Sequence, residues 1–205
     1  MHEQFLRQLV IAARPFHYPL WSTTFFLIQP TMPTSPLLLS TATDLLPAIN
    51  HARELLAERG MGVLGAWALL NLLVSGYYVT GTDAREEARY FHLMNVGWGF
   101  VNAVLAVWGL LSAHPNQVAG LTLADSLVAQ FHFEKILLFN AGLDIAYICV
   151  GSWLRARGAA EPHRPERLLG SGRSLWVQGA FLLFFDVGFY LVYHRYAGEL
   201  LQLVV

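Results

Sequence analysis

Four long apolar stretches divide the chain, and charged or turn-forming residues bound each of them. They cover residues 61–79, 90–113, 133–154 and 175–196. A helix needs about 20 residues to cross the ~30 Å hydrocarbon core of a bilayer, so each stretch is long enough to span a membrane. The pattern therefore predicts an all-α integral membrane protein, built as an antiparallel bundle of four helices.

Two further segments precede these stretches. Residues 44–60 place leucines at helical spacing on one face, which predicts an amphipathic helix that ends at Gly60 and lies at the membrane interface. The opposite, polar face of this helix carries Asn50, Arg53, Glu54 and Glu58. Residues 1–43 have a basic start and a short apolar segment interrupted by prolines. They are typical of a signal sequence or, alternatively, of an extension lying on the membrane surface.

Composition agrees with a membrane protein. Hydrophobic residues make up 55% of the chain and charged residues 13%, whereas soluble domains carry about 25% charge. A formal net charge of -1 offers no basic surface for nucleic acid. The single cysteine, Cys149, lies within the third apolar stretch and has no disulfide partner. We therefore expect the lipid bilayer as a partner, and no nucleic acid.

Arginines suggest how the helices are oriented. The segment 155–174 contains Arg155, Arg157, Arg164, Arg167 and Arg173. The positive-inside rule places such a loop in the cytoplasm. Alternation then places the first loop, with Arg85 and Arg89, on the same side, and the loop 115–130, which has no Lys or Arg, on the other.

Each apolar stretch carries a polar residue about ten or eleven positions from its start, which is near the bilayer midplane at a rise of about 1.5 Å per residue. These residues are Asn71, Asn102, Asp144 and Asp186. Helical spacing extends them into stripes that also contain His92, Asn95, Asn140 and Tyr147. Small residues such as Gly99 and Gly142 should let the helices approach closely. The eight polar residues are therefore predicted to face a common seam.

The seam has a functional and a structural interpretation. No Lys or Arg lies at this depth, so Asp144 and Asp186, if close together, would need a shared proton or a bound cation. The functional interpretation is a site for a proton, cation or small ligand. The structural alternative is hydrogen bonding between helices, worth about 1 kcal/mol per pair, in a non-catalytic structural or assembly subunit.

A second set of candidate residues lies at the outer ends of the predicted helices, away from the arginine-rich segment 155–174. It comprises His114, His132, Glu134 and His194. Imidazole and carboxylate groups suit zinc, copper or iron, so a metal- or haem-binding redox membrane protein is a third alternative. No HxxH or HExxH spacing supports it.

Three motifs carry a resemblance to a known family. They are YFHLMNVGWGFVN at 90–102, EKILLFNAGLDIAY at 134–147 and RLLGSGRSLWVQGAFLLFFD at 167–186. They resemble a family of small bacterial membrane proteins known only as a domain of unknown function. The resemblance implies a bacterial inner-membrane protein with four spans and an N-terminal signal sequence, but no activity. The prolines near the N-terminus depart from that pattern.

Motifs of common enzyme classes are missing. The sequence has no nucleophile elbow, phosphate-binding glycine loop or dinucleotide fingerprint, so it favours a non-catalytic protein and names no cofactor. Four spans without an internal repeat also argue against a monomeric transporter. A homo-oligomer, or a partner in a membrane complex, would compensate.

Overall fold

The computed structural model describes residues 36–113, 118–160 and 163–204, which belong to one compact unit. Every element in these ranges is helical. Residues 1–35 of the expected signal-like segment lie outside the described residues. The remainder of that segment, 36–43, already belongs to the first described helix.

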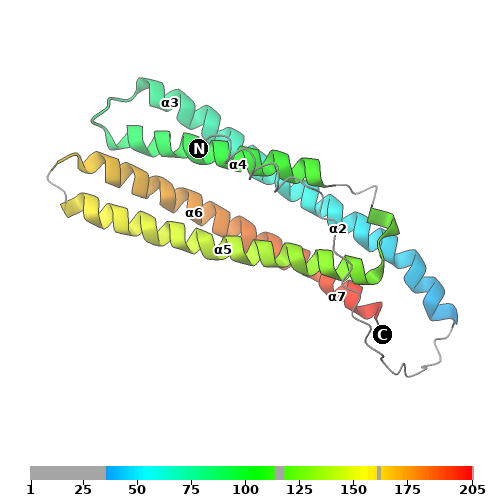
Figure 1. The fold of residues 1–205 in the computed structure, drawn as a ribbon. Helices are drawn as coiled ribbons and strands as arrows, with labels where there is room; N and C mark the ends of the chain where they lie inside the picture. The colour runs from blue at the N-terminus through cyan, green and yellow to red at the C-terminus, as the bar shows by residue number, and fades with distance from the viewer. Residues whose placement is uncertain (1–35, 114–117, 161–162, 205) are drawn as a thin grey trace, which may run out of the picture. The chain divides into compact units, whose positions relative to one another are not determined.

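The helices follow one another through short connections (Figure 1). Helix α2 (Pro36–Leu70) continues through a π-helical turn, η1 (Asn71–Ser75), into α3 (Gly76–Gly81). Then come α4 (Glu87–Ser112), a short 3-10 turn η2 (Val118–Gly120), α5 (Leu123–Ala160), α6 (Pro165–Tyr193) and α7 (Arg195–Gln202). Four helices are long and apolar enough to cross a membrane, namely Leu45–Gly81, Glu87–Ser112, Leu123–Ala160 and Pro165–Gln202. The expected all-α architecture with four such helices is confirmed.

The sequence pattern predicts a helix that ends at Gly60, but α2 continues through this residue to Leu70. A glycine stops a helix when it adopts a left-handed conformation, but no glycine in the described residues has a positive φ. Gly60 instead serves packing, because a Cβ at this position would lie 2.5 Å from the Phe189 ring. The amphipathic segment and the first apolar stretch are therefore one continuous helix.

Two residues of the polar face of that helix point inward, whereas the sequence pattern predicts that this face is exposed to water. Asn50 and Arg53 are completely buried, whereas Leu45 is 51% exposed. An interfacial helix would show its polar face to water. Here Arg53 contacts α5, and the apolar side is divided, because Leu56 packs against the buried cluster of Leu137, Phe189 and Tyr193.

The predicted loop 155–174 is also mostly helical. Helix α5 extends to Ala160 and α6 begins at Pro165, a residue suited to the first turn of a helix because it lacks an N–H. Arg164, with φ 57°, makes the turn between them. The arginines of this region therefore lie mainly on the helix ends.

Close approach of α5 and α6 depends on facing glycines. A Cβ on Gly151 would lie 2.8 Å from the Gly172 carbonyl oxygen, and a Cβ on Gly172 would lie 2.7 Å from the Gly151 oxygen. Gly99 packs α4 against α2 as expected, because a Cβ there would lie 3.1 Å from the Ala68 carbonyl oxygen. Gly142 faces open space, so its expected packing role is wrong.

Candidate functional site

The polar residues of the predicted seam separate into two groups. The first is centred on Gln178 of α6, which is completely buried. Its Nε2 donates hydrogen bonds to Asn71 Oδ1 (2.7 Å) and Asn95 Oδ1 (3.0 Å), and its Oε1 accepts one from Trp67 Nε1 (2.9 Å). Ser174, one turn earlier, donates to the same Asn95 oxygen at 2.6 Å. We refer to these five residues as the Gln178 network.

The Gln178 network joins three helical segments, namely the continuous segment α2–η1, helix α4 and helix α6. Both amide hydrogens of Gln178 are used, and Asn71 Nδ2 donates to the Trp67 carbonyl at 2.8 Å. A buried network whose groups are paired fixes the register of helices. Asn71 and Asn95, two residues of the predicted site, therefore hold the helices together.

His92 lies beside the π-helical turn. Its Nδ1 is 3.1 Å from Ser75 Oγ, and its ring stacks on Tyr78 with a centroid distance of 4.9 Å. It is not among the residues that line the cavity described next. The structure thus separates His92, too, from the second group.

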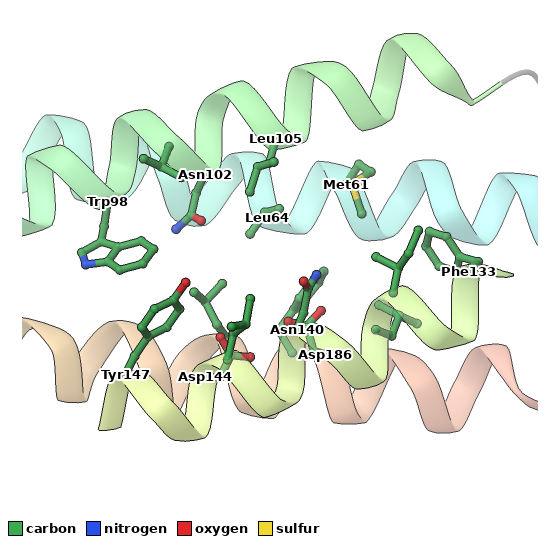
Figure 2. A pocket seen from close by; sticks show the side chains of 16 residues that line it. Met61, Leu64, Trp98, Asn102, Leu105, Phe133, Asn140, Asp144, Tyr147 and Asp186 are labelled. Carbon is green, nitrogen blue, oxygen red and sulfur yellow. The ribbon is translucent and has the colours of Figure 1, made fainter. Parts of the chain in front are cut away.

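The second group lines a cavity of about 300 Å³ (Figure 2). The cavity lies between α2 and α4 on one side and α5 and α6 on the other. Most of its wall is aliphatic or aromatic, and five predicted site residues contribute to it, namely Asn102, Asn140, Asp144, Tyr147 and Asp186. Its size lies at the lower end of the range for small-molecule sites, roughly 300–1,000 Å³.

Two carboxyl groups meet in the wall of this cavity. Asp144 on α5 and Asp186 on α6 are 3% and 6% exposed, and their carboxyl groups lie within hydrogen-bonding reach of each other. Gly179 permits this approach, because a Cβ there would lie 2.9 Å from the Asp144 backbone oxygen. Two carboxyl oxygens can share a hydrogen bond only when one carries a proton. The pair can therefore hold a proton, or exchange it for a cation.

Two buried polar atoms in the cavity wall have no partner in the structure. They are Asn102 Nδ2, a donor, and Asp144 Oδ2, an acceptor. Buried polar groups in folded proteins nearly always form hydrogen bonds, and leaving one unpaired costs about 1–3 kcal/mol. The cavity wall therefore contains one unpaired donor, from Asn102, and one unpaired acceptor, from Asp144.

An aromatic contact joins the two sides of the cavity. Trp98 of α4 and Tyr147 of α5 meet edge to face, with ring centroids 4.8 Å apart, and both side chains are visible in Figure 2. Among the described residues that line the cavity, Asp144 and Asp186 are the ionisable carboxylates, and Lys and Arg do not occur. Negative charge and aromatic surface are thus combined in one space.

A third polar cluster, which the sequence pattern does not predict, surrounds Arg53. Its Nη1 donates to the Ser126 carbonyl at 2.6 Å, whereas Nε and Nη2 have no hydrogen-bond partner. Nearby, Gln130 Nε2 donates to Glu134 Oε1 (2.8 Å) and to the Tyr193 carbonyl (3.0 Å). The sequence does carry a signal, a polar stripe on the first helix, but amphipathicity alone places that stripe on the solvent face.

The predicted metal site is only partly described. His194 Nδ1 lies 3.0 Å from Glu134 Oε1, so these two residues do meet, whereas His132 is exposed. Among the described residues, no three His, Cys, Asp or Glu side chains converge as a metal would require. His114 lies outside the described residues. A metal or haem site therefore stays a prediction.

Gln178 and Ser174 are the other residues that sequence reasoning missed. They share the face of α6 that carries Asp186, with residues 174, 178, 182 and 186 at intervals of four. Extending the Asp186 stripe toward the N-terminus of the helix would have found both.

Comparison with known proteins gives a family. Residues 63–187 match a family of unknown function, DUF6992, and this range is more than half of the chain. The chain belongs to this family. The match confirms the resemblance carried by the three motifs, and it includes every cavity-lining polar residue of this DUF6992 protein. No curated protein and no solved structure matches the chain.

Proposed function

We propose that this DUF6992 protein is a polytopic membrane protein whose cavity binds a small molecule or cation at Asp144 and Asp186. The membrane assignment is supported by four sufficiently long apolar helices. It is also supported by large apolar side chains on the outer surface, since Phe184 is 83% exposed and Leu111 74%. Continuous apolar surface of this kind is a liability in water and ordinary in lipid.

The orientation proposed from the sequence also has structural support. Arg155 lies 4.7 Å from the centre of the Trp176 ring and Arg173 lies 5.0 Å from that of Phe91, where the α5–α6 connection meets the start of α4. Arginine and aromatic residues gather at membrane interfaces, and arginine favours the cytoplasmic one. We place this end of the bundle in the cytoplasm of a bacterial cell.

One observation carries the binding function, namely the unpaired Asn102 and Asp144 atoms beside a carboxyl pair in an open cavity. If Asn102 only joined helices, its amide nitrogen should be paired, as the amide nitrogens of Gln178 and Asn71 are in the same bundle. The contrast within one protein supports a site over a packing role. No residue arrangement among the described residues calls for covalent chemistry, so we propose binding rather than catalysis.

Filling the cavity tests this function. Leu105 lines the cavity, whereas Leu111 lies on the same helix and is not among the lining residues. Mass spectrometry of solvent extracts should find a small molecule bound to purified wild-type protein and to the control Leu111→Trp, but not to Leu105→Trp. If all three proteins carry none and a density map shows only water in the cavity, the binding function is wrong.

The Gln178 network favours a second candidate, a non-catalytic assembly subunit. Its buried hydrogen bonds serve helix packing alone. In that case the partner would be another membrane protein or a second copy of this chain, and Leu105→Trp would leave the function intact.

A further inference from the structure

The chemistry of the cavity narrows the class of ligand, and this step rests on the binding function proposed above. We propose that the ligand is a lipid-soluble organic amine, bound as a cation against Asp144 and Asp186, which enters the cavity sideways from the bilayer between α4 and α5.

Charge is the first argument. Two carboxyl groups share the cavity wall, and no Lys or Arg lies among the described lining residues. When the pair holds one proton, it carries one negative charge in a largely apolar space, which is costly unless it is compensated. A single positive charge on the ligand compensates it, whereas an anion would add to the repulsion.

The surroundings distinguish an organic cation from a metal ion. Calcium or magnesium requires about six to eight oxygen ligands, and a transition metal requires several converging His, Cys or carboxylate groups. The described residues offer no such convergence, and the cavity wall is mostly hydrocarbon. Trp98, Tyr147, Phe133 and Phe185 supply aromatic surface. Aromatic rings stabilise ammonium groups through cation–π contacts and also pack against an apolar body.

The unpaired Asn102 donor adds a detail to the ligand. Asn102 lines the same cavity as the carboxyl pair, its side chain points from α4 toward α5 (Figure 2), and its Nδ2 needs an acceptor. A hydroxyl, ether or carbonyl oxygen close to the amine would satisfy it. The preferred ligand therefore carries an ammonium group and an oxygen acceptor on a compact apolar body.

The route of entry follows from the rim of the cavity. Lining residues of α4 and α5 are partly exposed on the outer surface, with Leu105 at 54% and Ile136 at 42%. Helix α5 packs mainly against α6, and α4 packs against α2 and α6. Helices α4 and α5 meet through the Trp98–Tyr147 ring contact and, at the start of α4, through the Arg155–Glu87 ion pair of 3.7 Å. The rim between them is apolar, and in a bilayer it would face lipid tails rather than water.

A pair of isosteric probes tests the charge requirement. N,N-dimethyl-2-phenylethylamine is cationic at neutral pH, and 3-methylbutylbenzene has the same shape without charge. Calorimetric titration of nanodisc-embedded protein, corrected with empty nanodiscs, should show the amine binding at least about tenfold more tightly. Asp144→Asn and Asp186→Asn should remove this preference while the hydrocarbon still binds. Asp125→Asn, at an exposed position of the same helix as Asp144, should keep it.

The outcomes separate the two proposals. Retained hydrocarbon binding also shows that the Asp144→Asn and Asp186→Asn proteins are folded, and loss of both probes in Leu105→Trp locates them in the cavity. Equal binding of amine and hydrocarbon to wild-type protein would overturn the cationic ligand and leave a binding cavity in place. Failure of both probes to bind wild-type protein would overturn the amine proposal and count against the binding function itself.

Discussion

Replacing Gln178 by leucine should destabilise the protein by about 2–4 kcal/mol, because three buried hydrogen bonds are lost and the Trp67 and Asn71 groups lose their shared partner. Leucine has a volume similar to that of glutamine, so the loss of stability reflects the missing hydrogen bonds and not an empty space in the core. Unfolding of the purified protein in mixed micelles, followed by circular dichroism, would measure it.

Gln202→Leu is the matched control, because Gln202 is exposed on α7. It should change the free energy of unfolding by no more than about 0.5 kcal/mol. Equal effects of the two substitutions would show that the Gln178 network contributes nothing measurable to stability.

Replacing Gly170 by alanine should cost about 3 kcal/mol, because the added Cβ would overlap the backbone of α4. Its nearest neighbours would be the Glu87 carbonyl oxygen and, at 2.8 Å, the Phe91 nitrogen. Backbone atoms in a helix cannot move aside as a side-chain end does, so α4 and α6 must separate. Thermal unfolding in the same detergent should show the loss.

Gly188→Ala provides the control on the same helix, since nothing lies within 4 Å of a Cβ at this position. Alanine there should stabilise the helix by up to about 1 kcal/mol, which is the opposite sign. If both substitutions stabilise the protein, the close crossing of α4 and α6 at Gly170 is wrong.

Much of the fold follows from sequence because length and polarity decide it. The four apolar stretches, and the stripes that place Asn102, Asp144 and Asp186 on inward faces, depend only on helical periodicity. Depth along a helix is likewise fixed by rise per residue. These features need no knowledge of which helix packs on which.

The rest depends on tertiary contacts. Asn71 and Asn102 look equivalent in sequence, yet Gln178 saturates one and leaves the other facing a cavity. Gly60 and Gly142 are both helical glycines, but only the first meets a neighbouring ring. Arg53 is predicted on a water-exposed face because amphipathicity identifies the polar side of a helix but not whether another helix packs against it. Such distinctions arise from the way the helices pair in the folded bundle.

The inward-facing Arg53 also has a consequence for the order in which the helices assemble during synthesis. Its hydrogen-bond partner, Ser126, lies 73 residues later in the chain. At roughly 5–20 residues per second of synthesis, α2 exists for about 4–15 s before the start of α5 is made. During that interval its arginine and asparagine must be sheltered by water, lipid headgroups or the insertion machinery. Helix α2 can therefore complete its packing against α5 only after α5 has been synthesised.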